Sequence, residues 1–213
     1  MKEEDGKKIF DENIEKDLKN SDKYGIIDNR GMASGKVGYT DGHTTITGKK
    51  AFDFNDYAAI EKEIDSFAKE FAYAEVEHAL VISPDGNAYS LIGTKSKVNT
   101  ELVGEKALKG CICIHNHPIE PGNDRADSFS LDDVYTSNKY LQGRQYLVSG
   151  TRRDAFEFTE YYITDKMENN WDKAKFDARN KHWNDGTIIE FLQQDTLREL
   201  NKYYKGFKYY ENI

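Results

Sequence analysis

The residues in this sequence best suited to chemistry are His115 and His117, which lie one residue apart in the run His-Asn-His-Pro. On an extended segment, side chains two positions apart project to the same side, about 6–7 Å apart at the backbone. Two imidazoles placed in this way can converge on one ion, with zinc–nitrogen distances of about 2.0–2.1 Å. The spacing therefore predicts two of the three protein ligands that a catalytic zinc site needs.

The candidate for the third ligand is Asp133, in the run Ser-Leu-Asp-Asp over 130–133. Ser-x-x-Asp is typical of a helix start, so we expect Ser130 to be the N-cap and Asp133 to lie in the first turn. Three protein ligands leave the fourth tetrahedral position open for water. Bound zinc can lower the pKa of that water to about 7, which supplies hydroxide at neutral pH.

Zinc-dependent hydrolysis also needs a carboxylate that takes a proton from water and passes it to the leaving group. Glu77 is the candidate, because it stands at the start of a predicted strand. Glu75 is a rival, since it lies on the same strand face if that strand begins early. At the helix start, the hydroxyl of Ser130 could donate a hydrogen bond to the oxyanion that develops on an attacked carbonyl.

Taken together, Glu77, His-Asn-His-Pro at 115–118 and Ser-x-x-Asp at 130–133 resemble the JAMM signature of the MPN/JAB zinc metalloproteases. The surrounding runs are especially similar to JAB-like domains of bacteria and phages, including the RadC-like branch, over roughly residues 70–160. The resemblance implies that His115, His117 and Asp133 bind Zn²⁺, that Glu77 is the general acid/base and that Ser130 stabilises the tetrahedral intermediate. It also implies a mixed β-sheet flanked by helices, similar to the cytidine-deaminase core.

The resemblance further implies hydrolysis of a peptide or isopeptide bond, with a protein or peptide substrate such as the C-terminus of a ubiquitin-like protein. Two alternatives stay open: a catalytically inactive MPN-fold module that binds protein, and a nucleic-acid-associated role like that of RadC-like proteins. The loop between His117 and Ser130 is longer than the common family spacing. Other acidic side chains are therefore alternative ligands, namely Asp132, Asp127 and Asp124.

The elements that must position these residues follow from hydrophobic periodicity. Apolar residues at three- and four-residue steps from Ile60 to Phe71 predict a helix beginning near Asp56. Two β-rich runs, 79–83 and 88–93, flank the turn Pro-Asp-Gly-Asn and predict a hairpin. Next we expect a short helix over 101–109, a buried strand ending at Pro118 and a helix from Ser130. Strands over 144–150 and 155–163 follow, and then helices from about 165 with a break near 184–186.

These elements predict an α/β protein with a mixed β-sheet flanked by helices and with extensions at both ends. We divide the chain into a partly disordered or irregular N-terminal extension (1–54), a JAB/MPN-like domain (55–163) and a C-terminal helical extension (164–213). The last segment is rich in aromatic residues, which either cover the core or supply a surface for a partner; packing is the default expectation.

Composition narrows the class of protein. The net charge of -8 disfavours nucleic acid as a partner, because affinity for phosphate backbones depends on Lys and Arg. Cys111 and Cys113 lie two apart on a predicted strand, where they cannot bond to each other, and we expect them to be buried small apolar residues. No apolar signal peptide or membrane span is visible, so we expect a cytoplasmic protein.

Overall fold

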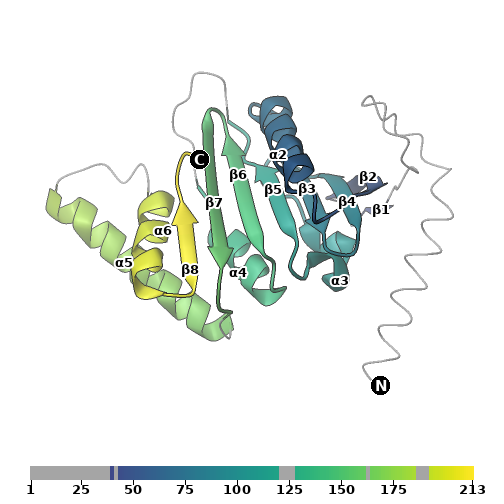
Figure 1. The fold of residues 1–213 in the computed structure, drawn as a ribbon. Coiled ribbons are helices and arrows are strands. Elements are labelled where there is room, and N and C mark those ends of the chain that lie inside the picture. The colour runs from purple at the N-terminus through teal and green to yellow at the C-terminus, as the bar shows by residue number, and fades with distance from the viewer. Residues whose placement is uncertain (1–38, 41–42, 120–127, 162–163, 186–191) are drawn as a thin grey trace.

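The computed structural model describes residues 39–40, 43–119, 128–161, 164–185 and 192–213. The described strands form one mixed sheet of eight in the order β1-β2-β4-β3-β5-β6-β7-β8 (Figure 1). Its first half contains β1 (Tyr39–Thr40), β2 (Thr45–Ala51), β3 (His78–Ser83) and β4 (Asn87–Ile92). Its second half contains β5 (Ile112–Asn116), β6 (Arg144–Ser149), β7 (Arg152–Phe158) and β8 (Phe207–Tyr210). The predicted α/β class with a mixed sheet is therefore confirmed at this level.

The first helix of the described chain, α2 (Tyr57–Phe71), forms as its periodicity predicts. Its N-cap is Asp56, whose side chain accepts a hydrogen bond from the backbone N–H of Ala59. The four apolar residues of the predicted stripe, Ile60 to Phe71, are all buried. They pack on one face of the sheet, against side chains that include Ile114 and Val148.

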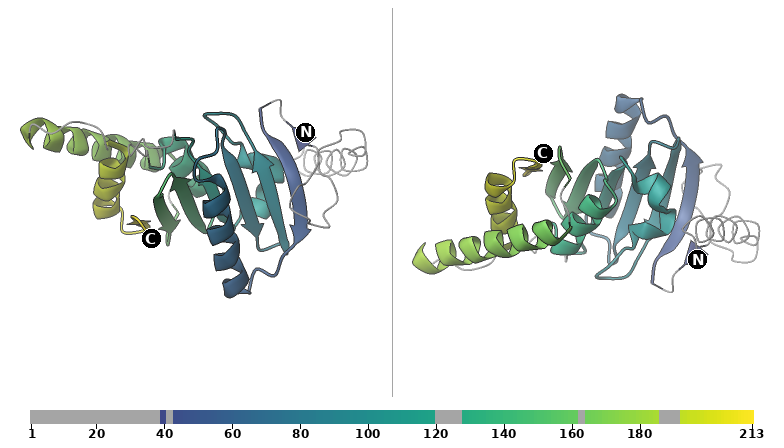
Figure 2. Two further views of the ribbon diagram at one scale, coloured as in Figure 1. Left: turned by 90° about the horizontal axis from the view of Figure 1, so that it is seen from above. Right: turned by 90° about the horizontal axis from the view of Figure 1, so that it is seen from below.

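The helices on the opposite face come from later in the chain (Figure 2). They are the short α3 (Glu105–Leu108), which follows a 3-10 turn at Thr100–Val103, then α4 (Leu131–Lys139), α5 (Thr164–Asp185) and α6 (Leu192–Tyr203). Their buried residues form two clusters on that face, one around Leu108 and Val81 and one around Phe129 and Phe156. The sheet is thus covered by helices on both sides, and its strands are correspondingly apolar.

One crossover connection places the end of a strand and the start of a helix at the same edge of the sheet. β5 and β6 are parallel, whereas every other described strand pair is antiparallel. A parallel pair needs a long connection, and here α4 lies within it. The carboxyl end of β5 and the N-terminus of α4 consequently lie at the same edge of the sheet, which is where open α/β sheets bind ligands.

The flanking segments contribute strands to the sheet. β2 comes from the predicted N-terminal extension, and β8 comes from the predicted C-terminal one, where Phe207 to Tyr210 pair with β7. The three-part domain division stays a prediction, although the sheet runs across both of its boundaries. Residues 1–38 of the extension predicted to be partly disordered or irregular lie outside the described residues.

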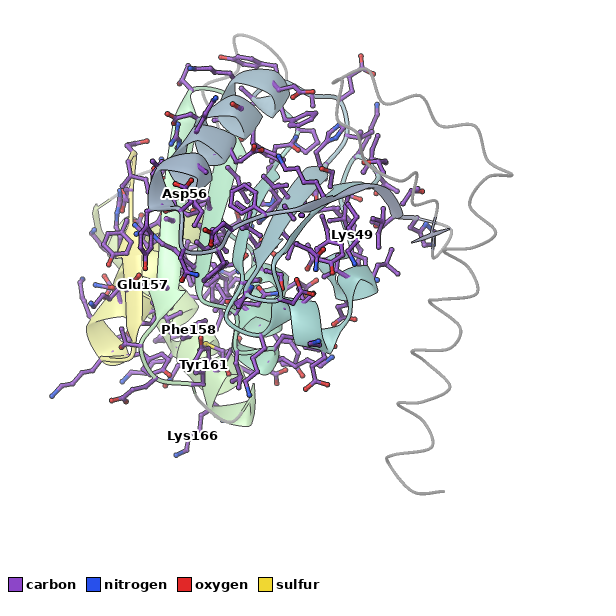
Figure 3. All side chains as sticks on the ribbon, turned by 45° about the vertical axis from the view of Figure 1, so that its right-hand side comes forward. Lys49, Asp56, Glu157, Phe158, Tyr161 and Lys166 are labelled. Carbon is purple, nitrogen blue, oxygen red and sulfur yellow. The ribbon has the colours of Figure 1, made fainter. Side chains whose placement is uncertain are left out.

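The aromatic residues of the C-terminal segment are mainly packing residues. Trp171, Tyr204 and Phe207 are buried against β6 and β7, whereas Phe176 and Tyr203 are exposed. Figure 3 shows the side chains, with Phe158 and Tyr161 labelled at the end of β7, where their rings lie 5.7 Å apart. Within the described part of the chain, no helix combines the length and the apolar character that crossing a bilayer requires.

Candidate metal centre

The sheet brings His115, His117 and Asp133 together. His115 lies on β5, His117 follows that strand directly, and Asp133 lies in the first turn of α4. One nitrogen or oxygen atom of each side chain lies within 4.8 Å of the others, so the cluster could hold a metal ion. The three residues come from the two elements that the crossover places side by side. The end of β5 and the start of α4 therefore lie next to each other, as the sequence predicts.

The separations between these atoms match those of ligands around a small ion. Nε2 of His115 lies 3.3 Å from Nε2 of His117 and 3.4 Å from Oδ1 of Asp133. Ligand atoms about 2.0–2.1 Å from a tetrahedral centre lie roughly 3.3–3.4 Å from one another. Oδ2 of Asp133 lies 3.8 Å from Nε2 of His117. The donor atoms thus fit a four-coordinate ion with three protein ligands and one open position.

The start of α4 fixes the carboxylate of Asp133. Ser130 and Asp133 form a reciprocal capping box, as the sequence predicts. Oδ2 of Asp133 accepts hydrogen bonds from the backbone N–H and from the hydroxyl of Ser130, both at 2.7 Å. Burial raises the pKa of Asp133, but both imidazoles and both Ser130 hydrogen bonds oppose it, and the net pKa is lowered. An ionised carboxylate therefore faces the histidines, and its Oδ1 is directed toward His115.

His115 is held in the form that binds metals. Its side chain is buried, and its ring contacts the ring of Phe129 edge-on at 5.9 Å between centroids. Burial lowers the pKa of His115, although Asp133 opposes this effect. The neutral imidazole is the ligand form, so the environment of His115 favours metal binding at neutral pH.

Glu77 directly precedes β3 and lies beside the cluster. Ala79 on β3 pairs with His115 on β5, and extending this antiparallel register by two residues places Glu77 opposite His117. Residues two apart on a strand share a face, so Glu77 lies on the same face as His117. The backbone of Glu77 is fixed by two hydrogen bonds of 2.7 Å, with Thr94 and Gly93.

Asn116, between the two histidines, holds this strand end in place. Its Oδ1 accepts from the backbone N–H of His78 at 2.6 Å, and its Nδ2 donates to the carbonyl of Val76 at 3.1 Å. The fully buried carboxamide thereby bridges the two residues that flank Glu77. Sequence reasoning missed this role, for which the position of a buried Asn between two candidate ligands was the available signal.

The environment of Glu77 suits proton transfer. Burial and the nearby Asp133 carboxylate raise the pKa of Glu77 to about 7, while a hydrogen bond from the backbone of Val98 lowers it. A general acid/base works best when its pKa lies near the operating pH. Glu77 has therefore the chemistry expected of the candidate acid/base.

The cluster opens into a cleft of about 540 Å³. Glu77 and the three cluster residues line this cleft together with Ser130. One wall is the segment 95–101, and other lining residues are Cys113, Thr136, Gln142 and Gln193. A group that enters the cleft would therefore lie beside both the cluster and Glu77.

The structure separates the alternative site residues. Glu75 is exposed and does not line the cleft, and Asp132 lines it without joining the cluster. Asp124 and Asp127 lie outside the described residues. The hydroxyl proton of Ser130 is directed to Asp133, so its predicted role as an oxyanion donor requires the hydroxyl to rotate.

The two cysteines do not belong to the cluster. Both are free and buried, as predicted. Cys113 pairs with Val81 and Gln145 in the middle of the sheet, and burial is the main cause of its raised pKa. A thiol with a raised pKa is a poor metal ligand and a poor nucleophile.

Comparison of the chain with protein-family models, with curated proteins and with solved structures gives no match.

Proposed function

We propose that this chain is a zinc-dependent peptidase or isopeptidase of the JAMM type, which hydrolyses an amide bond with a zinc-activated water. The observation that supports this most strongly is the cluster geometry, with donor separations of 3.3 and 3.4 Å among His115, His117 and Asp133. Two nitrogen donors and one carboxylate oxygen form a ligand set typical of catalytic zinc. When bound, zinc supplies the Lewis acidity that makes water nucleophilic near neutral pH.

The protein's own residues supply the remaining functions. Glu77, whose pKa is about 7 in the metal-free protein, accepts a proton from the attacking water and returns it to the leaving amine. The hydroxyl of Ser130 lines the cleft and donates to the developing oxyanion after it turns from Asp133. The capping-box hydrogen bond from the Ser130 backbone still holds Asp133 after that rotation.

Zinc content is the first test, measured on purified protein by elemental mass spectrometry. We expect one zinc per wild-type chain and a loss of zinc in His115→Ala. His43→Ala is the matched control, because His43 is exposed and lies outside the cluster. A wild-type protein that takes up no zinc, or a His115→Ala variant that retains it, contradicts the proposal.

Turnover is the second test, measured with peptides and with conjugates of ubiquitin-like proteins. We expect Glu77→Gln to retain zinc and to lose activity by about 10²–10⁴-fold, the usual contribution of a general acid/base. If wild type and Glu77→Gln both bind zinc and a protein partner but neither cleaves it, the inactive binding module replaces the enzyme.

A further inference from the structure

Three glutamine side chains line the same cleft as the metal cluster: Gln142, Gln145 and Gln193. Gln142 follows α4, Gln145 lies on β6 and Gln193 lies in the first turn of α6. Gln142 and Gln145 are only 2% and 4% exposed, although glutamine is usually a surface residue. Their burial requires an explanation, because a polar group without a partner is costly to bury.

Two polar atoms in this group have no partner within the described residues. Nε2 of Gln145 donates to Oε1 of Gln142 at 2.7 Å, which joins the two carboxamides. Nε2 of Gln142 and Oε1 of Gln193 are buried, and neither forms a hydrogen bond within the described ranges. One is a donor and the other is an acceptor, so the glutamines that line the cleft hold one unsatisfied donor and one unsatisfied acceptor within the described ranges.

Gln145 lies on β6, the strand next to the one that carries His115. Gln145 pairs with Cys113, which is two residues before His115 on β5. Paired residues and residues two apart on a strand share a face, so Gln145 and His115 point to the same side of the sheet. One such step is about 6.5–7 Å along a strand. Together with the spacing of about 4.8 Å between neighbouring strands, this places the backbone of Gln145 about 8 Å from that of His115.

The backbone around Gln142 is fixed. Its N–H donates to the carbonyl of Ser137 at 2.9 Å, and its carbonyl accepts from the hydroxyl of Tyr161 at 2.6 Å. Tyr161, labelled in Figure 3, also packs against Phe158. Because the backbone of Gln142 is already fixed, ligand binding loses little conformational entropy at this position.

We propose that Gln142, Gln145 and Gln193 form a subsite that binds an uncharged carboxamide of the substrate. The free N–H of Gln142 matches the carbonyl oxygen of such a group, and the free oxygen of Gln193 matches its NH₂. A carboxylate cannot donate to Gln193, and burying its charge among neutral carboxamides is costly. The subsite rests on the proposed function, because its position is defined from the metal cluster.

The test uses the hydroxamates of glutamine, methionine and glutamate, in which the hydroxamate binds zinc and the side chain probes the subsite. Their affinities for the zinc-loaded protein are measured by calorimetry. We expect glutamine hydroxamate to bind about five- to tenfold more tightly than the other two, the effect of about one neutral hydrogen bond. Equal affinities, or no binding of any of the three, overturn the subsite.

Substitutions of the cleft glutamines test which side chains cause the preference for glutamine hydroxamate. Gln142→Met is expected to bind zinc normally and to lose the preference for glutamine hydroxamate. If this variant does not fold, Gln193→Met tests the acceptor half, with Gln194→Met as its control, because Gln194 is buried on the same helix without lining the cleft. If Gln142→Met and Gln193→Met still prefer glutamine hydroxamate, other residues recognise its side chain and the proposal is refuted. Failure of wild type to bind zinc is a separate result, which overturns the proposed function and the subsite together.

Discussion

Replacing Glu77 with Gln should stabilise the metal-free protein at alkaline pH. The pKa of Glu77 is about 7 in the folded protein, against an ordinary value of 4.5. The folded state binds this proton more tightly than the unfolded chain does, so stability falls as the pH rises between these two values. The full difference corresponds to about 3.4 kcal/mol, and solvent screening in the open cleft reduces it to about 1–2 kcal/mol.

Glutamine at position 77 cannot ionise, so the variant should not lose the free energy of unfolding that wild type loses as the pH rises. Urea denaturation with a chelator present, at about pH 5 and about pH 8, measures the free energy of unfolding of both proteins. We expect the variant to gain about 1–2 kcal/mol on wild type between the two conditions. Glu75→Gln is the matched control, because Glu75 is exposed and outside the cleft. A gain equal to that of the control, or a loss, would refute the electrostatic account of Glu77.

Three further predictions concern two hydrogen-bonding side chains and the metal cluster. Asn116→Ala should lower the free energy of unfolding by about 2–4 kcal/mol, measured in urea, because two backbone groups beside Glu77 lose their partner; an unchanged midpoint would contradict this. Tyr209→Phe should lower it by about 1–2 kcal/mol, because buried Asp154 loses a donor at 2.7 Å; a neutral effect would show that Asp154 keeps enough partners. Zinc should raise the thermal midpoint of wild type but not of His115→Ala, as scanning calorimetry can show, since only the native cluster binds it; equal shifts would place the zinc elsewhere.

The parts of the fold predicted from sequence are those encoded locally. The stripe of α2, the hairpin of β3 and β4 and the capping box of Ser130 each depend on residues close together in the chain. The positions of His115 and His117 followed from the alternation of a single strand. Asp133 was predicted as the third ligand because Ser-x-x-Asp marks the start of the next helix and places a carboxylate in its first turn, and because the JAMM resemblance implies it.

The parts that escaped prediction depend on pairing between distant segments. β8 has only four residues, and its place beside β7 is set by a register with residues about fifty positions earlier. The carboxamide of Asn116 continues the contact between β5 and β3 beyond their last paired residues, and its two partners, His78 and Val76, lie about forty positions earlier in the chain. Gln142 and Gln145 belong to no motif, and their burial follows only from the assembled cleft.

The two carboxylate oxygens of Asp133 have different contacts, and this difference affects which metal ion the cluster can bind. Two donors from Ser130 occupy Oδ2, which leaves Oδ1 as the free oxygen. Calcium requires six to eight oxygen ligands and often a bidentate carboxylate, and magnesium requires an octahedron of oxygens. A single oxygen beside two ring nitrogens gives these hard cations too little, whereas it suffices for a softer ion of low coordination number. The same contacts that begin a nine-residue helix thus also make this cluster a poor match for calcium and magnesium.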